Sequence, residues 1–346
     1  MRAFSASQAV SPAIERTKRY LFGEFEFTTY LKLAAVACIS EGFTANVGFA
    51  TSRHLATDAD AALPIHFSDE IIALFVLAIV AFVACGIIVF YLVACFRFVF
   101  FHCLVYQTKE IRPLWNRYRP QAIRFFNAGL VLWIIFAAVS ALVVLPFAVN
   151  LYHLFRAVEN GVEFDSGGSF LQFIPLLAIL PALGLIAFLI DVVLHDFMLP
   201  HMALEDASFA AAWRAARSRI AAQKGSFALY CLLRAVLPLA ALIGLLIVVG
   251  IPFFIVFGVL SMSAAGFLRM LEDSTPLGMA FHLIFEIFLG VILIGFGLIA
   301  EFGLGGPVAT WVRNYALLYY GGRYKALGDV LSSTPTPAAE STPGTA

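Results

Sequence analysis

Five long apolar runs dominate the pattern of hydrophobic and polar positions along the chain. A helix needs roughly 20 apolar residues to cross a bilayer core about 30 Å thick, and each run is at least that long. Backbone groups in hydrocarbon must be hydrogen-bonded within the structure, and the alternation typical of a membrane β-barrel is missing, so the runs are predicted to be helices. The predicted spans are residues 71–96, 125–149, 170–190, 227–262 (broken only by Arg234) and 277–300 (broken only by Glu286).

A sixth span is predicted for residues 28–48, although Lys32, Glu41 and Asn46 interrupt its apolar pattern. Basic residues gather in four segments, and the loops between these segments are mainly acidic. Because short loops rich in Lys and Arg stay in the cytoplasm, both termini are expected there, which requires an even number of crossings. The alternative is a re-entrant or interfacial helix at residues 28–48. The basic segments are residues 2–32, 109–124, 214–224 and 313–325.

The sequence therefore predicts an all-α fold, a polytopic membrane helix bundle of about six transmembrane helices. Amphipathic elbow helices are expected on its cytoplasmic side, in the basic segments that contain Trp115, Trp213 and Trp311. Residues 1–27 form the cytoplasmic N-terminal amphipathic segment and residues 28–325 the transmembrane domain. Residues 326–346 are predicted to be a disordered tail, because Pro, Ser and Thr replace apolar residues there.

Composition excludes several classes of protein. Hydrophobic residues make up 62% of the chain and charged residues 13%, too apolar for a soluble globule or a disordered chain. Lys plus Arg and Asp plus Glu number 22 each, so the net charge gives no reason to expect nucleic acid as a partner. No Walker loop, dinucleotide fingerprint, Gly-x-Ser-x-Gly or CxxC motif occurs. We therefore expect no enzyme activity, no cofactor and no metal.

Ionisable residues within the spans are the most informative, because each is costly in hydrocarbon unless it is paired or hydrated. Pro200 is expected to end the helix that carries Asp196, whose carboxylate then needs a cation; Arg97 is the first candidate and Arg234 the second. The cluster is either a structural clasp between helix ends or a cavity that binds an anionic head group or solute. Its predicted members are Arg97, Asp191, His195, Asp196 and Arg234.

Two histidine–carboxylate pairs leave a second function open. His195 follows Asp191 by four residues and His282 precedes Glu286 by four, so each pair shares a helix face. His201, just after Pro200, is instead expected to face the interface. The leading interpretation is a non-enzymatic protein that binds membrane lipids or a small anion, or assists another membrane protein. The alternative is a proton-coupled secondary transporter that uses Asp191, His195 or Glu286.

Several short motifs resemble those of an uncharacterised family of bacterial polytopic integral membrane proteins. This family is similar to the membrane domain that precedes some glycerophosphodiester phosphodiesterases. The resemblance implies a bacterial cytoplasmic (inner) membrane, and it does not imply phosphodiester hydrolysis because the chain contains no soluble phosphodiesterase domain. The motifs are Pro12 to Phe22, Tyr30 to Leu33, Trp115 to Arg119, Asp196 to Met202, Ala212 to Arg214 and Pro307 to Leu317.

We predict that a reporter fused ahead of Arg16 lies in the cytoplasm. A phosphatase that is active only in the periplasm should be inactive there and active when it is inserted beside Glu163, in an acidic loop. Phosphatase assays on cells that express the two fusions test the orientation. Activity ahead of Arg16 would overturn it.

Overall fold

The computed structural model describes residues 4–23, 25–41, 69–159, 173–252 and 276–333, together with residues 255 and 258. Within these residues every regular element is helical, which confirms the all-α fold class. The chain divides into two compact units. The first comprises Met1–Leu114 and Gly225–Ala346, and the second comprises Trp115–Lys224.

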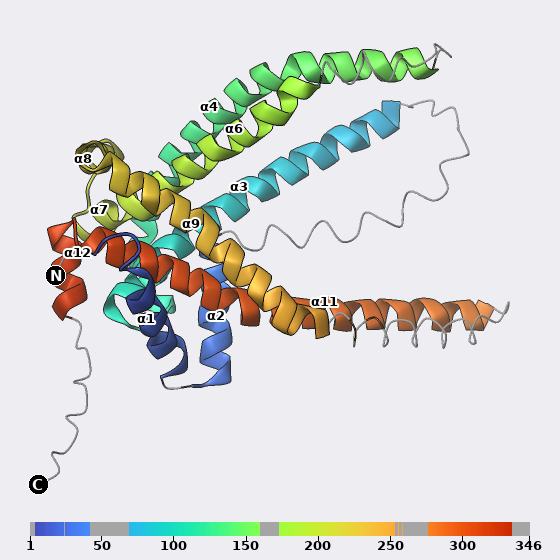
Figure 1. Cartoon of the computed structure of the whole chain (residues 1–346). Coiled ribbons are helices and arrows are strands. Elements are labelled where there is room, and N and C mark those ends of the chain that lie inside the picture. The colour runs from blue at the N-terminus through green and yellow to red at the C-terminus, as the bar shows by residue number, and fades with distance from the viewer. Residues whose placement is uncertain are drawn as a thin grey trace, which may run out of the picture. The chain divides into compact units, whose positions relative to one another are not determined.

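Five helical segments in the described part of the chain are long and apolar enough to cross a membrane, and each overlaps one of the five predicted runs. Several exceed the roughly 20 residues that a span needs: the longest helix has 48 residues, about 72 Å at 1.5 Å per residue. These segments are therefore longer than the bilayer core is thick; Figure 1 shows the long helices that contain them. They are built on α3 (Asp69–Tyr106), α4 (Arg112–Glu159), α6 (Ile174–Val192), α9 (Lys224–Leu245, continued by η3, Leu246–Gly250) and α11 (Pro276–Gly321).

The predicted sixth span begins as α2 (Phe27–Glu41), a helix of 15 residues. At about 22 Å it is shorter than a bilayer core of about 30 Å. Tyr30 near its start and Cys38 near its end both meet the short stretch 303–306 of α11, so α2 crosses that helix (Figure 1). The sixth span is thus not among the described spans, and residues 42–48 of it lie outside the described residues.

The crossing of α2 over α11 depends on a proline and a glycine. Pro307 within α11 has no N–H to donate to the carbonyl of Gly303, and the Tyr30 hydroxyl donates to that carbonyl instead, at 2.5 Å. Gly306 lies so close to α2 that a Cβ there would be 2.4 Å from the Cβ of Ala34. The two backbones can approach because neither residue carries a large side chain.

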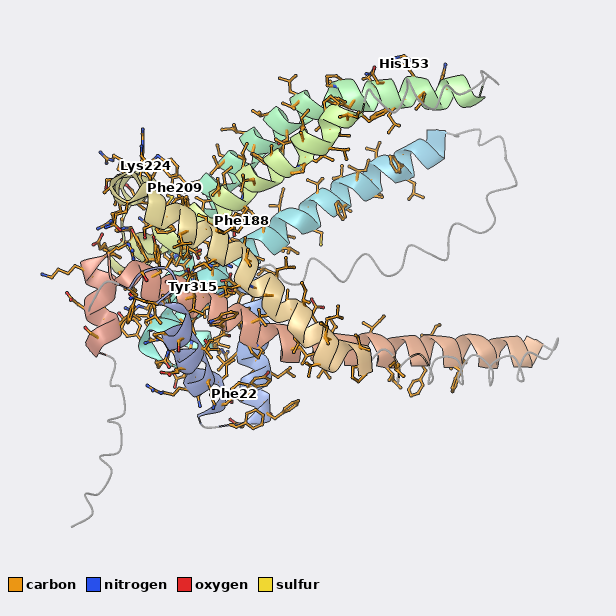
Figure 2. All side chains as sticks on the ribbon, in the orientation of Figure 1. Phe22, His153, Phe188, Phe209, Lys224 and Tyr315 are labelled. Atoms are coloured by element: carbon orange, nitrogen blue, oxygen red, sulfur yellow. The ribbon has the colours of Figure 1, made fainter. Side chains whose placement is uncertain are left out.

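In the first unit the core lies at one end of the long helices. The helices α1 (Val10–Phe22), α2 and α12 (Lys325–Ser333) gather around the C-terminal turns of α3 and α11, where Tyr315 lies (Figure 2). Along α3 the change is abrupt, since Phe98 is 0% and Phe82 81% exposed. The apolar side chains on the other half of α3 are available to hydrocarbon.

The second unit contains α4, α6, η2 (Val193–Met198), α7 (Leu199–Leu204) and α8 (Phe209–Ala222). Its buried residues concentrate in η2 and α7, against which α8 packs. Ser208 accepts a hydrogen bond from the Ala211 N–H and caps α8 at its N-terminus. Of the expected elbows only α8 is a separate helix; Trp115 and Trp311 lie within α4 and α11, because Pro120 and Pro307 are accommodated inside these helices.

The C-terminal boundary was predicted too early. The helix α12 extends the folded part to Ser333, and Leu327 and Leu331 are buried on one of its faces. Four-residue spacing of these leucines places them on the same side of a helix. The predicted tail therefore cannot begin at residue 326, and residues 334–346 lie outside the described residues.

We predict that Gly306→Ala lowers stability by about 1–3 kcal/mol, because the added methyl group overpacks the contact with Ala34. Thermal unfolding in detergent, followed by size-exclusion chromatography, measures the effect. The matched control is Gly297→Ala on the same helix, where a Cβ meets no atom within 4 Å. Equal melting temperatures for the two variants would contradict the proposed close approach.

Candidate functional site

Two arginines within the apolar helices reach the same end of α2. Arg97 on α3 donates a hydrogen bond from Nε to the backbone carbonyl of Ser40, at 3.0 Å. Arg234 on α9 donates from Nη2 to Oε2 of Glu41, at 2.6 Å. Ser40 and Glu41 are the last two residues of α2, so both guanidinium groups meet at its C-terminus.

This arrangement stabilises the helix end and the buried charges together. The last carbonyls of a helix have no partner within it, and the negative end of the helix dipole favours a nearby cation. The side chains of Arg234 and Glu41 are only 10% and 2% exposed, and a buried charge is costly unless it is paired. The two arginines therefore join α3 and α9 to α2.

The predicted cluster is only partly assembled by these contacts. Arg97 and Arg234 both reach the end of α2, and the carboxylate that holds Arg234 is Glu41. In the sequence, Glu41 was noted only because it interrupts the predicted span at residues 28–48. Its position as an acid near the end of an apolar run was the available signal that it pairs with a buried cation. A direct pair between Arg97 and Asp196 stays a prediction, as do the roles of the remaining members, which lie in the second unit: Asp191, His195 and Asp196.

His195 and Asp196 lie in the π-helical turn η2, where they are 1% and 2% exposed. The N–H of Leu199 donates to the carbonyl of Leu194, five residues earlier, which is the wider spacing of a π-turn. Pro200 has no N–H, and its ring crowds the carbonyl four residues before it, that of Asp196. The wider turn accommodates the proline, so the helical segment continues to Leu204. The prediction that Pro200 ends the helix is wrong.

His201 on α7 contacts both the carboxylate of Glu205 and the guanidinium of Arg219. Its Nδ1 lies 3.3 Å from Oε2 of Glu205, and its Nε2 lies 2.9 Å from Nη1 of Arg219 on α8. A guanidinium only donates, so Nε2 accepts, and the proton of a neutral imidazole then lies on Nδ1 and faces the carboxylate. His201 is 2% exposed. It therefore fixes α8 to α7 instead of facing the interface, and its four-residue spacing from Glu205 was the available signal.

Arg16 on α1 binds the C-terminus of α3 in the same manner as Arg97 binds that of α2. Its Nη2 donates to the carbonyls of Leu104 (2.8 Å) and Val105 (3.2 Å). Burial, together with the nearby Arg19, lowers the pKa of Arg16 to about 10. It remains a cation at neutral pH and thus ties the N-terminal helix to α3.

Arg323, just beyond α11, joins both ends of the chain. Its Nη1 donates to the carbonyls of Tyr319 (2.8 Å) and Phe4 (3.0 Å), and its Nη2 donates to Oγ of Ser226 (2.9 Å). Its guanidinium carbon lies 4.0 Å from the centroid of the Tyr319 ring. The N-terminal segment and the end of α11 therefore lie side by side within the first unit.

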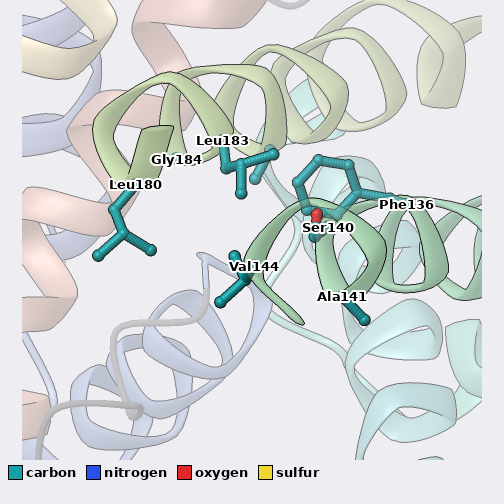
Figure 3. Close-up of a pocket in the computed structure, with 8 residues that line it drawn as sticks. Phe136, Ser140, Ala141, Val144, Leu180, Leu183 and Gly184 are labelled. Atoms are coloured by element: carbon teal, nitrogen blue, oxygen red, sulfur yellow. The ribbon is translucent and has the colours of Figure 1, made fainter. Parts of the chain in front are cut away.

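An apolar groove with a volume of about 350 Å³ lies between α4 and α6 in the second unit (Figure 3). A single hydroxyl, that of Ser140, is the only polar side-chain group among the residues that line it. A Cβ at Gly184 would meet no atom within 4 Å. Sequence reasoning missed this groove, for which the small residues inside two apolar spans were the available signal. Its lining includes Phe136, Ser140, Val144, Leu180, Leu183 and Gly184.

The remaining candidates from the sequence are possible metal ligands, the cysteines and the pair His282 and Glu286. Within the described residues no three His, Cys, Asp or Glu side chains gather as a metal site would require. The cysteines are free thiols, four of them buried. His282 and Glu286 lie on α11, but their side chains are outside the described part of the structure.

We predict that Glu41→Ala and Arg234→Ala each destabilise the protein by about 3–5 kcal/mol, because each leaves a buried charge without its partner. The double variant should recover part of this loss, which is a coupling measurable by unfolding in detergent. The control is the exposed pair Arg124–Asp206, at 43% and 65% exposure, whose removal should cost about 1 kcal/mol or less. Additive losses for Glu41 and Arg234 would refute the pair.

No curated protein and no solved structure matches the chain significantly. The comparisons likewise give no link to glycerophosphodiester phosphodiesterases. A model of a family of unknown function, DUF7544, matches residues 4–330, which is nearly the whole chain. Five helical segments fit to span a bilayer agree with an integral membrane protein. The chain therefore belongs to DUF7544, a family of unknown function.

Proposed function

We propose that this membrane protein binds a phospholipid without catalysing a reaction and holds the end of an acyl chain in the groove between α4 and α6. The groove itself carries the proposal. Its volume of about 350 Å³ is within the range of ligand sites, and its lining offers carbon atoms and one hydroxyl. Exposed side chains elsewhere on α4 and α6 are apolar as well, including Leu142, Leu177 and Leu185.

The depth of the groove supports an acyl chain as its occupant. On α4 the groove begins at Phe136, 11 residues or about 16 Å from the start of the apolar run at Phe125, and its lining continues to Val144. One leaflet of a bilayer core is about 15 Å thick, so the end of an acyl chain reaches this level. A polar solute would find no ion pair or hydrogen-bonding array in the lining.

Arg97 and Arg234 fit the structural clasp better than the anion site. Each guanidinium is directed at the end of α2, and Arg234 already has a carboxylate within 2.6 Å. A small anion would have to compete with Glu41 for Arg234. We therefore assign these two arginines to stability and place lipid binding in the second unit.

We further propose a bacterial cytoplasmic membrane with both termini in the cytoplasm. The contact between Phe4 and Arg323 supports one side for both ends, and the basic segments support the cytoplasmic side. The resemblance to bacterial polytopic membrane proteins, including the membrane domain of some glycerophosphodiester phosphodiesterases, agrees with this location.

A proton-coupled transporter is the second candidate, because π-turns are frequent at functional sites and η2 carries the buried His195 and Asp196. Transport needs a hydrated path to these groups, whereas lipid binding does not. Water-soluble thiol reagents applied to single cysteines beside Asp191 distinguish the two, since an absence of labelling excludes the path.

We predict that Gly184→Leu reduces the lipid that co-purifies with the protein several-fold, because the new side chain fills the groove. Native mass spectrometry of gently extracted protein measures the lipid retained. Gly86→Leu is the matched control: it also adds a side chain where no atom lies within 4 Å, but on α3 outside the groove. Equal lipid retention by the two variants would exclude the groove as the site.

A further inference from the structure

The orientation of α8 is fixed by contacts on one of its sides. Ala212 and Ala216 are buried, and Arg219 turns inward to His201. Ser208 fixes the start of the helix. The opposite face of α8 is consequently held outward.

This outward face combines an aromatic ring with two cations. Trp213 is 44% exposed, and Arg214 and Arg217 are exposed beside it. Arg217 follows Trp213 by four residues and Arg214 by three, so the three side chains are neighbours on the helix surface. The Nε of Arg214 reaches the Ala210 carbonyl of its own helix at 3.4 Å, which keeps that side chain along α8. We call these three residues the α8 patch.

Among the described residues, the acids in the loop before α8 are engaged away from the α8 patch. The helix itself contains no Asp or Glu. In the loop before it, Glu205 contacts His201 and Asp206 forms an ion pair with Arg124. The positive field of the patch is therefore directed outward.

We propose that the α8 patch binds the head groups of anionic phospholipids. The proposal specifies the class of lipid for the proposed function. It rests on the proposed function only for the position of the acyl chain in the groove. Indole rings favour the membrane interface, guanidinium groups bind phosphate oxygens in pairs, and each basic residue near an anionic surface adds attraction. A zwitterionic head group carries no net charge and gains less from the two arginines.

The test uses the full chain in phosphatidylcholine vesicles that contain a minor fraction of brominated phosphatidylglycerol or brominated phosphatidylcholine. Bromine quenches tryptophan fluorescence at contact, and the difference between wild type and Trp213→Phe isolates the signal of Trp213. In wild type, brominated phosphatidylglycerol should quench Trp213 more than brominated phosphatidylcholine does.

Arg214→Gln with Arg217→Gln should remove this preference, with a loss of local enrichment of about fivefold per arginine. The matched control is Arg117→Gln with Arg119→Gln, which removes two exposed cations of α4 in the same unit and should preserve most of the preference. Equal quenching by the two lipids in wild type overturns the proposal. Equal losses in the two double variants also overturn it, because they indicate the net charge of the unit instead of the α8 patch.

This experiment is independent of the groove. Gly184→Leu should lose co-purifying lipid yet keep the preference of Trp213 for phosphatidylglycerol. If wild type retains no lipid but shows the preference, the groove proposal fails and the α8 patch stands. If wild type retains lipid without the preference, the reverse holds.

Discussion

The C-terminal carbonyls of helices that end beside hydrocarbon need partners, and the first unit is arranged around this requirement. The ends of α2, α3 and α11 each receive hydrogen bonds from an arginine outside the helix, respectively Arg97, Arg16 and Arg323. Arginine suits the task because its guanidinium carries five donors, keeps its charge and opposes the negative end of the helix dipole. Arg16 and Arg323, which lie in the basic segments that indicate orientation, thus also hold helix ends in place.

The same requirement explains where the packing lies. Short helices and arginines gather at one end of α3 and α11, and the side chains there are buried against one another. The other halves of these helices satisfy their own backbones and expose apolar side chains, which hydrocarbon accommodates. Protein side chains pack closely where Gly306 meets Ala34 and where polar groups must be paired. Elsewhere on these helices, lipid can contact the apolar side chains instead.

The second unit contains the two surfaces that we propose bind lipid, the groove and the α8 patch. A π-turn lets the chain pass Pro200 without ending, which brings His201 to Arg219 and orients α8. Small residues leave an apolar groove between α4 and α6. The cationic, aromatic face of α8 complements an anionic head group, and the apolar groove complements an acyl chain. The presence of both surfaces in one unit underlies the lipid-binding proposal.

The sequence by itself determined the all-α class and the five spans, because hydropathy and helical period are local properties of the chain. It also identified Arg97 and Arg234 as residues that need partners, since their burial follows from the apolar runs around them. Only the tertiary structure decided that Glu41 is the partner of Arg234, that α2 crosses α11, and that Pro200 is absorbed by a wider turn. Each of these depends on which residues distant in the chain come into contact, and hydrogen-bond geometry between helices leaves no periodic trace in the sequence.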